Sequence, residues 1–73
     1  MKTVWVCHFI NSRGDTRARY FKTADEAADF TATLDKRIER GSCGGYILSD
    51  FRVPEETKIT TKEVAVHRKS AEK

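Results

Sequence analysis

The stretch from Thr23 to Gly41 carries the pattern of one amphipathic helix with both of its ends marked. Thr23, followed three residues later by Glu26, forms a capping box that satisfies the free amides of a first helical turn. Gly41 suits the left-handed conformation that often ends a helix. The stripe that recurs at helical spacing consists of Ala27, Phe30, Thr31, Leu34 and Ile38. This pattern predicts a single helix over Ala24 to Arg40, so the rest of the domain must be built from strands and loops.

The segments on either side of the helix have the β-branched and aromatic character of strands. We predict strands at Thr3–Ile10, Thr16–Lys22, Tyr46–Val53 and Ile59–His67. Between the first two, Asn11 suits the first position of a type I turn and Gly14 the left-handed position that follows. The Arg-Gly-Asp triplet at residues 13–15 therefore predicts a hairpin loop. An adhesive ligand would need an exported loop, and we see no export signal.

The predicted order of strand, strand, helix, strand, strand indicates an α+β fold in two layers. A right-handed crossover through the helix makes the third strand parallel to the second and places it beside the first. The expected result is a mostly antiparallel, four-stranded sheet of order 2-1-3-4 with one helix packed on one face. The 73 residues suffice for one small domain, expected over residues 1–67, with a frayed tail at 68–73.

The first strand is apolar on both faces, whereas one helix can cover only one of them. With Asn11 opposite Asp15, one face carries Val4, Val6, His8, Ile10, Ala18 and Tyr20, and the other carries Trp5, Cys7, Phe9, Arg17, Arg19 and Phe21. We expect the helix on the second face, because Phe21 lies just before the helix cap; the reverse assignment stays open. The uncovered face suggests an interaction site, unless the C-terminal segment folds back over it or a homodimer buries it.

Composition and cysteine usage indicate a soluble domain in the cytoplasm. Charged residues make up 34% of the chain, and no apolar run approaches the roughly 18 residues of a membrane span. Without an export signal, Cys7 and Cys43 are expected to be reduced thiols, although the sequence leaves a bridge between them open.

No combination of residues predicts catalysis, a cofactor or a metal site. Cys7 and His8 are neighbours in a strand and point to opposite faces, so they cannot share a metal ion. The Gly-rich stretch at residues 41–45 follows a helix rather than preceding one, which favours a helix stop over a phosphate site. A thiol enzyme at Cys43, with His8 or His67 as the base, is a distant alternative.

The basic residues form two groups that could contact nucleic acid. The net charge is +3, and acidic residues are interspersed with the basic ones, so the charge permits this partner without requiring it. The nucleic-acid candidates are Arg13, Arg17 and Arg19 in the hairpin and Lys36, Arg37 and Arg40 at the helix end.

A turn glycine followed by a Phe-x-Thr entry into an amphipathic helix is present at Gly14, Phe21 and Thr23. In this respect the stretch Trp5–Leu34 resembles the arm-type DNA-binding domain of tyrosine recombinases, which implies DNA contacts by the hairpin. That family places three strands before its helix, whereas this chain has two before and two after. We therefore do not assign the chain to it.

The sequence favours a small non-enzymatic protein-binding module that acts by steric contact with a target protein or a second copy. Phages and mobile elements encode accessory or inhibitor proteins of this kind. The predicted contact residues are Val4, Val6, Ile10 and Tyr20, with Arg17 and Arg19 at the rim. The alternative is a small DNA- or RNA-binding regulator that uses the Arg13–Arg19 hairpin. Neither function involves a membrane, a cofactor or a small-molecule substrate.

Overall fold

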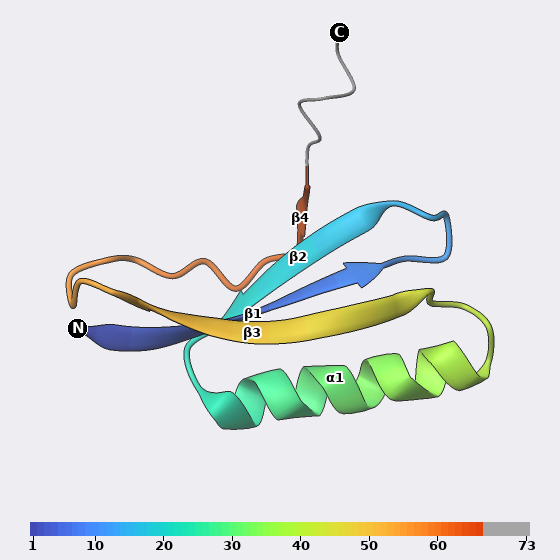
Figure 1. The fold of residues 1–73 in the computed structure, drawn as a ribbon, viewed down its shortest axis with the longest axis horizontal. Coiled ribbons are helices and arrows are strands. Elements are labelled where there is room, and N and C mark those ends of the chain that lie inside the picture. The colour runs from blue at the N-terminus through green and yellow to red at the C-terminus, as the bar shows by residue number, and fades with distance from the viewer. Residues whose placement is uncertain (67–73) are drawn as a thin grey trace, which may run out of the picture.

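The structure is a computed structural model that describes residues 1–66, and it has one helix packed on one sheet (Figure 1). The elements in chain order are β1 (Lys2–Ile10), β2 (Thr16–Phe21), α1 (Ala24–Glu39), β3 (Gly45–Val53) and β4 (Val64–Ala65). The strands form one four-stranded sheet of order β3-β1-β2-β4 in which every pairing is antiparallel. The predicted two-layer α+β fold is confirmed. The predicted tail at 68–73 and His67 lie outside the described residues.

The β1–β2 hairpin has the register that the turn chemistry predicts. Trp5 lies opposite Phe21, and Ile10 lies opposite Thr16. In the turn, the amide of Gly14 donates to the carbonyl of Asn11 at 3.0 Å, and Gly14 has a φ of +87°. The side-chain oxygen of Asn11 also accepts from the amide of Asp15 at 3.0 Å. The Arg-Gly-Asp triplet is therefore part of the hairpin loop, as predicted.

Both ends of α1 form as the sequence predicts, with one residue of difference at the C-terminus. The amide of Glu26 donates to the hydroxyl of Thr23 at 3.2 Å. The predicted last residue, Arg40, is the C-cap, and Gly41 follows it with a φ of +79°. The amide of Ser42 donates to the carbonyl of Arg37 at 2.8 Å, which together with the left-handed glycine is a Schellman motif.

The fourth strand differs from the prediction in length and position. A strand over Ile59–His67 beside the third strand was expected, but β4 is two residues long and pairs with β2, opposite Arg17 and Ala18. The physical reason is the path of the chain after Pro54 (Figure 1): residues 57–60 lie on the sheet face opposite α1, and residues 61–65 then run beside β2 rather than beside β3. Consequently β3 is an edge strand, and the sheet order is 3-1-2-4.

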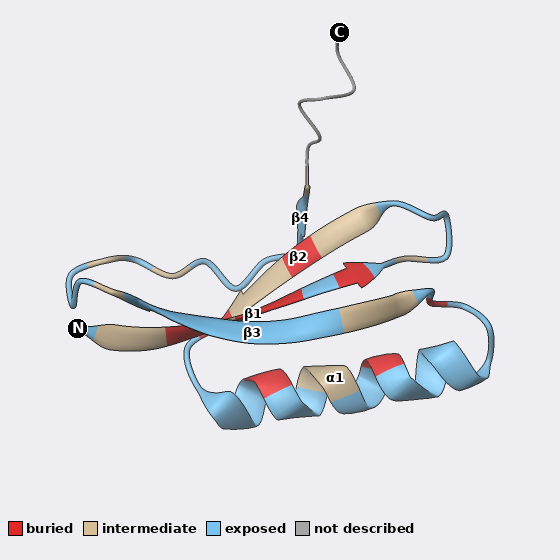
Figure 2. Cartoon of the chain, in the orientation of Figure 1, coloured by how far each residue is buried: buried red, intermediate tan, exposed pale blue. Residues whose placement is uncertain are grey.

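The main core lies between α1 and the sheet face that carries the odd-numbered residues of β1. Its buried members are Cys7, Phe9, Phe21, Ala27, Leu34 and Cys43, with Trp5, Phe30 and Tyr46 packed against them. Phe30 of the helix contacts both Phe9 and Phe21, with ring centroids 5.3 and 5.4 Å apart. The expectation that α1 covers the face of Trp5, Phe9 and Phe21 is therefore confirmed. Figure 2 shows buried positions on the inner side of α1 and along β1 and β2, while β3 is mostly exposed.

Candidate functional site: the open face of the sheet

The sheet face opposite α1, here called the open face, is the candidate site. The register places on it Val4, Val6, His8 and Ile10 of β1, Ala18 and Tyr20 of β2, Ile47, Ser49 and Phe51 of β3, and Val64 of β4. No helix of the described residues covers this face, and α1 is the one helix among them. Apolar side chains on the open face can therefore be exposed to solvent.

The prediction that Val4 and Val6 are exposed on this face is wrong. Val4 is 1% exposed and Val6 is 5% exposed. Residues 57–60 fold back beside Val4, and the ring of Tyr20 meets that of Phe51 edge-on, with centroids 6.3 Å apart. The chain thus covers part of its own open face, which is one of the alternatives that the sequence left open. Because both valines are buried, they are not available for contact with a partner.

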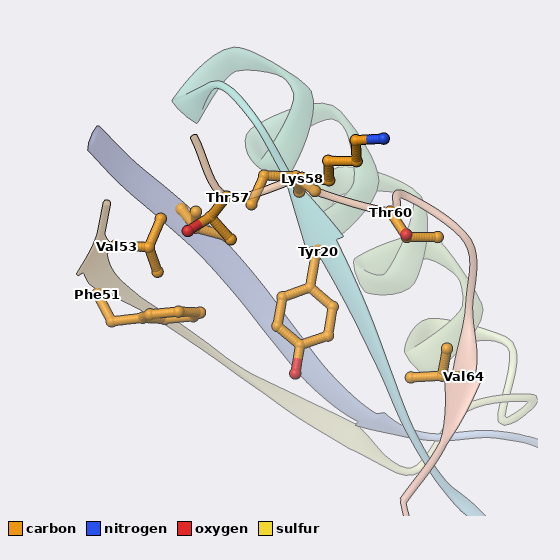
Figure 3. Close-up of a pocket in the computed structure, with 9 residues that line it drawn as sticks. Tyr20, Phe51, Val53, Thr57, Lys58, Thr60 and Val64 are labelled. Carbon is orange, nitrogen blue, oxygen red and sulfur yellow. The ribbon is translucent and has the colours of Figure 1, made fainter. Parts of the chain in front are cut away.

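An apolar hollow of about 250 Å³ remains between the sheet and the returning segment. It is lined by Val4, Tyr20, Phe51, Val53, Thr57, Lys58, Ile59, Thr60 and Val64. In Figure 3 the ring of Tyr20 stands between Phe51 on one side and Val64 on the other. A pocket for a drug-sized ligand has a volume of roughly 300–1,000 Å³, so this hollow has the size for one or two apolar side chains.

Exposed apolar side chains lie along the open face, and two of them, Phe51 and Val64, line the hollow. Ile47 is 70% exposed, Phe51 and Val64 are each 41% exposed, and Ile10 is 40% exposed. All of them point to the open face, since Ile47 pairs with His8, Phe51 with Val4, and Val64 with Ala18. These exposed side chains come from three strands, and together they make a larger apolar surface than the isolated exposed residue that is normal on a soluble domain.

The two arginines predicted at the rim interact with their own chain. The guanidinium of Arg17 donates to the carboxylate of Glu63 at 2.8 Å. Arg19 donates to the carbonyl of Thr61 at 3.0 Å, and its guanidinium lies 5.1 Å from the ring centroid of Phe30. Both side chains are on the α1 side of the sheet, so they hold the segment before β4 against β2. They do not border the open face, contrary to the prediction.

The remaining predicted basic residues gather at one end of the molecule. The β1–β2 turn with Arg13 and the C-terminal turn of α1 with Lys36, Arg37 and Arg40 lie at the same end in Figure 1. The amide of Gly44 donates to the carbonyl of Ile10 at 2.9 Å, which joins the loop after α1 to the end of β1. All four basic side chains are exposed.

The cysteines are free and buried, and nothing around them resembles a reactive thiol. Cys7 is fully buried, and burial, together with the nearby thiol of Cys43, raises the pKa of Cys7 from 9.0 to about 11. A reactive cysteine has a lowered pKa and access to solvent. Within residues 1–66, no group of three or more His, Cys, Asp and Glu side chains is placed to bind a metal ion.

Sequence reasoning missed the contribution of β3 to the open face. Phe51 and Ile47 were within a predicted strand, and their alternation with charged Asp50 and Arg52 was visible in the sequence. The pairing of the third strand with the first was predicted, but its register, which places Phe51 opposite Val4, was not. The hollow also depends on residues 57–60, whose path is set by packing rather than by a local pattern.

Within the described part of the chain, no helix has the length and apolar character that crossing a membrane requires. Comparison of the chain with protein-family models, with curated proteins and with solved structures found no match.

Proposed function

We propose that this chain is a small non-enzymatic protein-binding module whose contact surface is the open face. The observation that carries the proposal is the apolar hollow lined by Tyr20, Phe51 and exposed Val64, with exposed Ile47 further along the same sheet face. Aromatic side chains beside a hollow of this size are suited to take up an apolar anchor residue of a partner. The action is steric, as in the accessory and inhibitor proteins of phages and mobile elements.

The hollow favours a protein partner over a small molecule because of its size and its lining. Its lining is mostly apolar, and its polar side-chain groups are the threonine hydroxyls, the Tyr20 hydroxyl and the Lys58 ammonium. A small-molecule site usually has a few convergent polar groups that orient the ligand. Exposed Ile47 lies on the same sheet face as the hollow, so a partner with an extended surface gains more contact than a compact ligand.

Selection of random peptides on the immobilised protein tests this proposal. We expect the selected peptides to be rich in aromatic and large aliphatic residues and to bind Phe51→Ala about tenfold or more weakly, since removing an anchor contact costs about 1–2 kcal/mol. Tyr20→Ala should act in the same way. Ile38→Ala, a partly exposed residue of α1 on the opposite side of the sheet from the open face, is the matched control and should bind like the wild type.

Two results would contradict the proposal. One is that peptides bind the Phe51→Ala and Tyr20→Ala variants as tightly as the wild type while these variants remain folded. The other is that no peptide is selected although the same library yields binders to a control domain.

A DNA- or RNA-binding regulator remains the second candidate, on one observation. The turn with Arg13 and the helix end with Arg37 and Arg40 form a basic end of the molecule. Two further arginines were expected to contribute, but Arg17 forms an ion pair with Glu63 and Arg19 stacks on the ring of Phe30. If this end binds nucleic acid, affinity must fall steeply between about 50 and 200 mM salt as counterions are released. Peptide binding at the apolar open face should change little over that range.

A further inference from the structure

A second, separate surface is the free edge of β3. Within the described residues, β3 is at the end of the sheet and pairs with β1 alone. It is nine residues long, and the six residues Ile47–Arg52 are all exposed. Natural sheets protect long edges with charged side chains, especially lysine, or with proline, bulges or a covering segment. β3 has two opposite charges, Asp50 and Arg52, but neither lysine nor proline, and no described segment covers it. Such an edge is a template for another strand.

The hydrogen bonds of the hairpin show which groups of β3 are free. The amide of Asn11 donates to the carbonyl of Asp15, which immediately precedes β2. Because the direction of backbone groups alternates along a strand, the odd-numbered residues of β1 direct their amides and carbonyls toward β2. The even-numbered residues therefore face β3, in agreement with the carbonyl of Ile10, which accepts from Gly44. Even-numbered residues of β1 pair with odd-numbered residues of β3. The outward-facing backbone groups of β3 consequently belong to Tyr46, Leu48, Asp50 and Arg52.

These four residues define one register for pairing with an identical strand. From these observations we infer that β3 pairs antiparallel with β3 of a second copy of this chain, in the register that places Ser49 opposite Ser49. Residues 46, 48, 50 and 52 are symmetric about position 49, so only this register uses all of them. Each copy then offers four amides and four carbonyls, which makes eight intermolecular hydrogen bonds.

The side chains in this register are compatible on both faces of the joined sheet. On the open face, Ile47 lies opposite Phe51 of the other copy, which covers apolar surface that is exposed in one chain. On the α1 side, Leu48 lies opposite Asp50, and Tyr46 lies opposite Arg52. No like charges are directly opposed. The register centred on Asp50 would instead oppose two carboxylates and leave Tyr46 unpaired.

The pairing joins the open faces of the two copies into one surface. It uses the outward backbone groups of β3, whereas the hollow is lined by side chains; Phe51 is the one residue whose side chain takes part in both. Two hollows then lie on the same side of an eight-stranded sheet, since each copy contributes four strands. A two-fold partner, or one with two anchor segments, would engage both.

Symmetric disulfide formation tests the register directly. Ser49→Cys is expected to cross-link under mild oxidation, because directly opposed residues that are not hydrogen-bonded to each other have Cα atoms about 4.5 Å apart, within the range of a disulfide. Ile47→Cys is the matched control on the same face. Two copies of residue 47 would be separated by four positions, roughly 13 Å along the strand, so this variant should not cross-link. The native Cys7 and Cys43 are buried and should stay reduced.

Solution mass tests the pairing without cysteine chemistry. We expect the mass of the wild type to rise toward that of a dimer between about 10 µM and about 1 mM, a range that detects weak association. Asp50→Pro removes an outward-facing amide at an edge, where proline is tolerated. It should weaken the dimer by about tenfold or more, whereas Asp50→Ala keeps the amide and should associate normally.

Amide hydrogen exchange of the wild type provides a readout if Asp50→Pro fails to fold. Raising the protein concentration should slow exchange at Leu48 and Asp50 while leaving Ile47 and Ser49, already bonded to β1, unchanged.

A mass that stays monomeric up to about 1 mM would overturn the inference. So would a dimer insensitive to Asp50→Pro, efficient cross-linking through Ile47→Cys but not Ser49→Cys, or exchange at Leu48 and Asp50 that is slow at every concentration.

Discussion

Leu34 and Ile38 lie one helical turn apart on the predicted apolar stripe, yet they have different environments. Leu34 is fully buried against the sheet, whereas Ile38 is 38% exposed near the end of α1. Helical spacing therefore identified the face correctly but not how far along the helix that face is covered.

Substitution of these two residues should have unequal effects on stability. Leu34→Ala leaves a cavity among Cys7, Phe9 and Phe21, and such a change lowers the free energy of unfolding by about 2–5 kcal/mol. Ile38→Ala removes a side chain that is already partly in water and should cost about 1 kcal/mol or less. Urea unfolding followed by circular dichroism measures both. Equal losses in the two variants would contradict the packing described here.

Cys7 should resist alkylation in the folded protein and make stability decrease at high pH. In a Cys43→Ala background, reaction with iodoacetamide at pH 8 should be about a hundredfold slower than in urea, because burial raises the pKa of Cys7 from 9.0 to about 11. Between those pH values the unfolded chain loses the thiol proton first. The free energy of unfolding should therefore fall with rising pH, by up to about 1.4 kcal/mol per pH unit.

Replacing Cys7 with alanine supplies the control for the pH effect. The variant should lack that part of the alkaline decrease which starts near the ordinary thiol pKa of 9.0. An unchanged pH profile, or fast alkylation of Cys7 in the native protein, would mean that the thiol is not held in an apolar environment.

At the scale of the elements, three features could be predicted from local sequence: the register of the hairpin and the two ends of α1. Asn11 and Gly14 set the hairpin register, and Thr23 and Gly41 set the two ends of α1. Each acts through contacts within a few residues, which is why sequence reasoning found them. The position of β4 depends instead on Arg17, Arg19 and the path of residues 54–63, and these are contacts between segments more than forty residues apart. No local pattern contains that information.

Gly41→Ala should destabilise the end of α1 through backbone conformation alone. A Cβ at this position would have no neighbour within 4 Å, but φ is +79°, and an alanine in that conformation costs about 1 kcal/mol. Gly41→Asn should cost less, because asparagine tolerates left-handed backbone better. Thermal unfolding of both variants measures the difference. If alanine and asparagine were equally well tolerated, the Schellman motif would not be what ends the helix.

At the scale of the whole molecule, a single helix leaves one side of the sheet for other segments to cover. The returning segment lies beside Val4, whereas Ile47 and Phe51 remain exposed. The sequence indicated that apolar residues on one face would not be covered by a helix, because β1 is apolar on both sides and only one helix was predicted. It could not show which residues would remain exposed, since that depends on the sheet order and on the crossing of residues 54–63. Of the predicted contact residues, Ile10 and Tyr20 remain on the open face and accessible.

The account depends most on the open face as the docking surface, and an NMR titration of the labelled protein with a peptide selected on it tests this directly. We expect the amide shifts of Tyr20, Phe51 and Val64 to change, together with those of Thr57–Thr60 around the hollow, while the exposed side of α1 stays unchanged. Shifts that instead cluster on Lys36, Arg37 and Arg40, with none around Tyr20 and Phe51, would contradict the account.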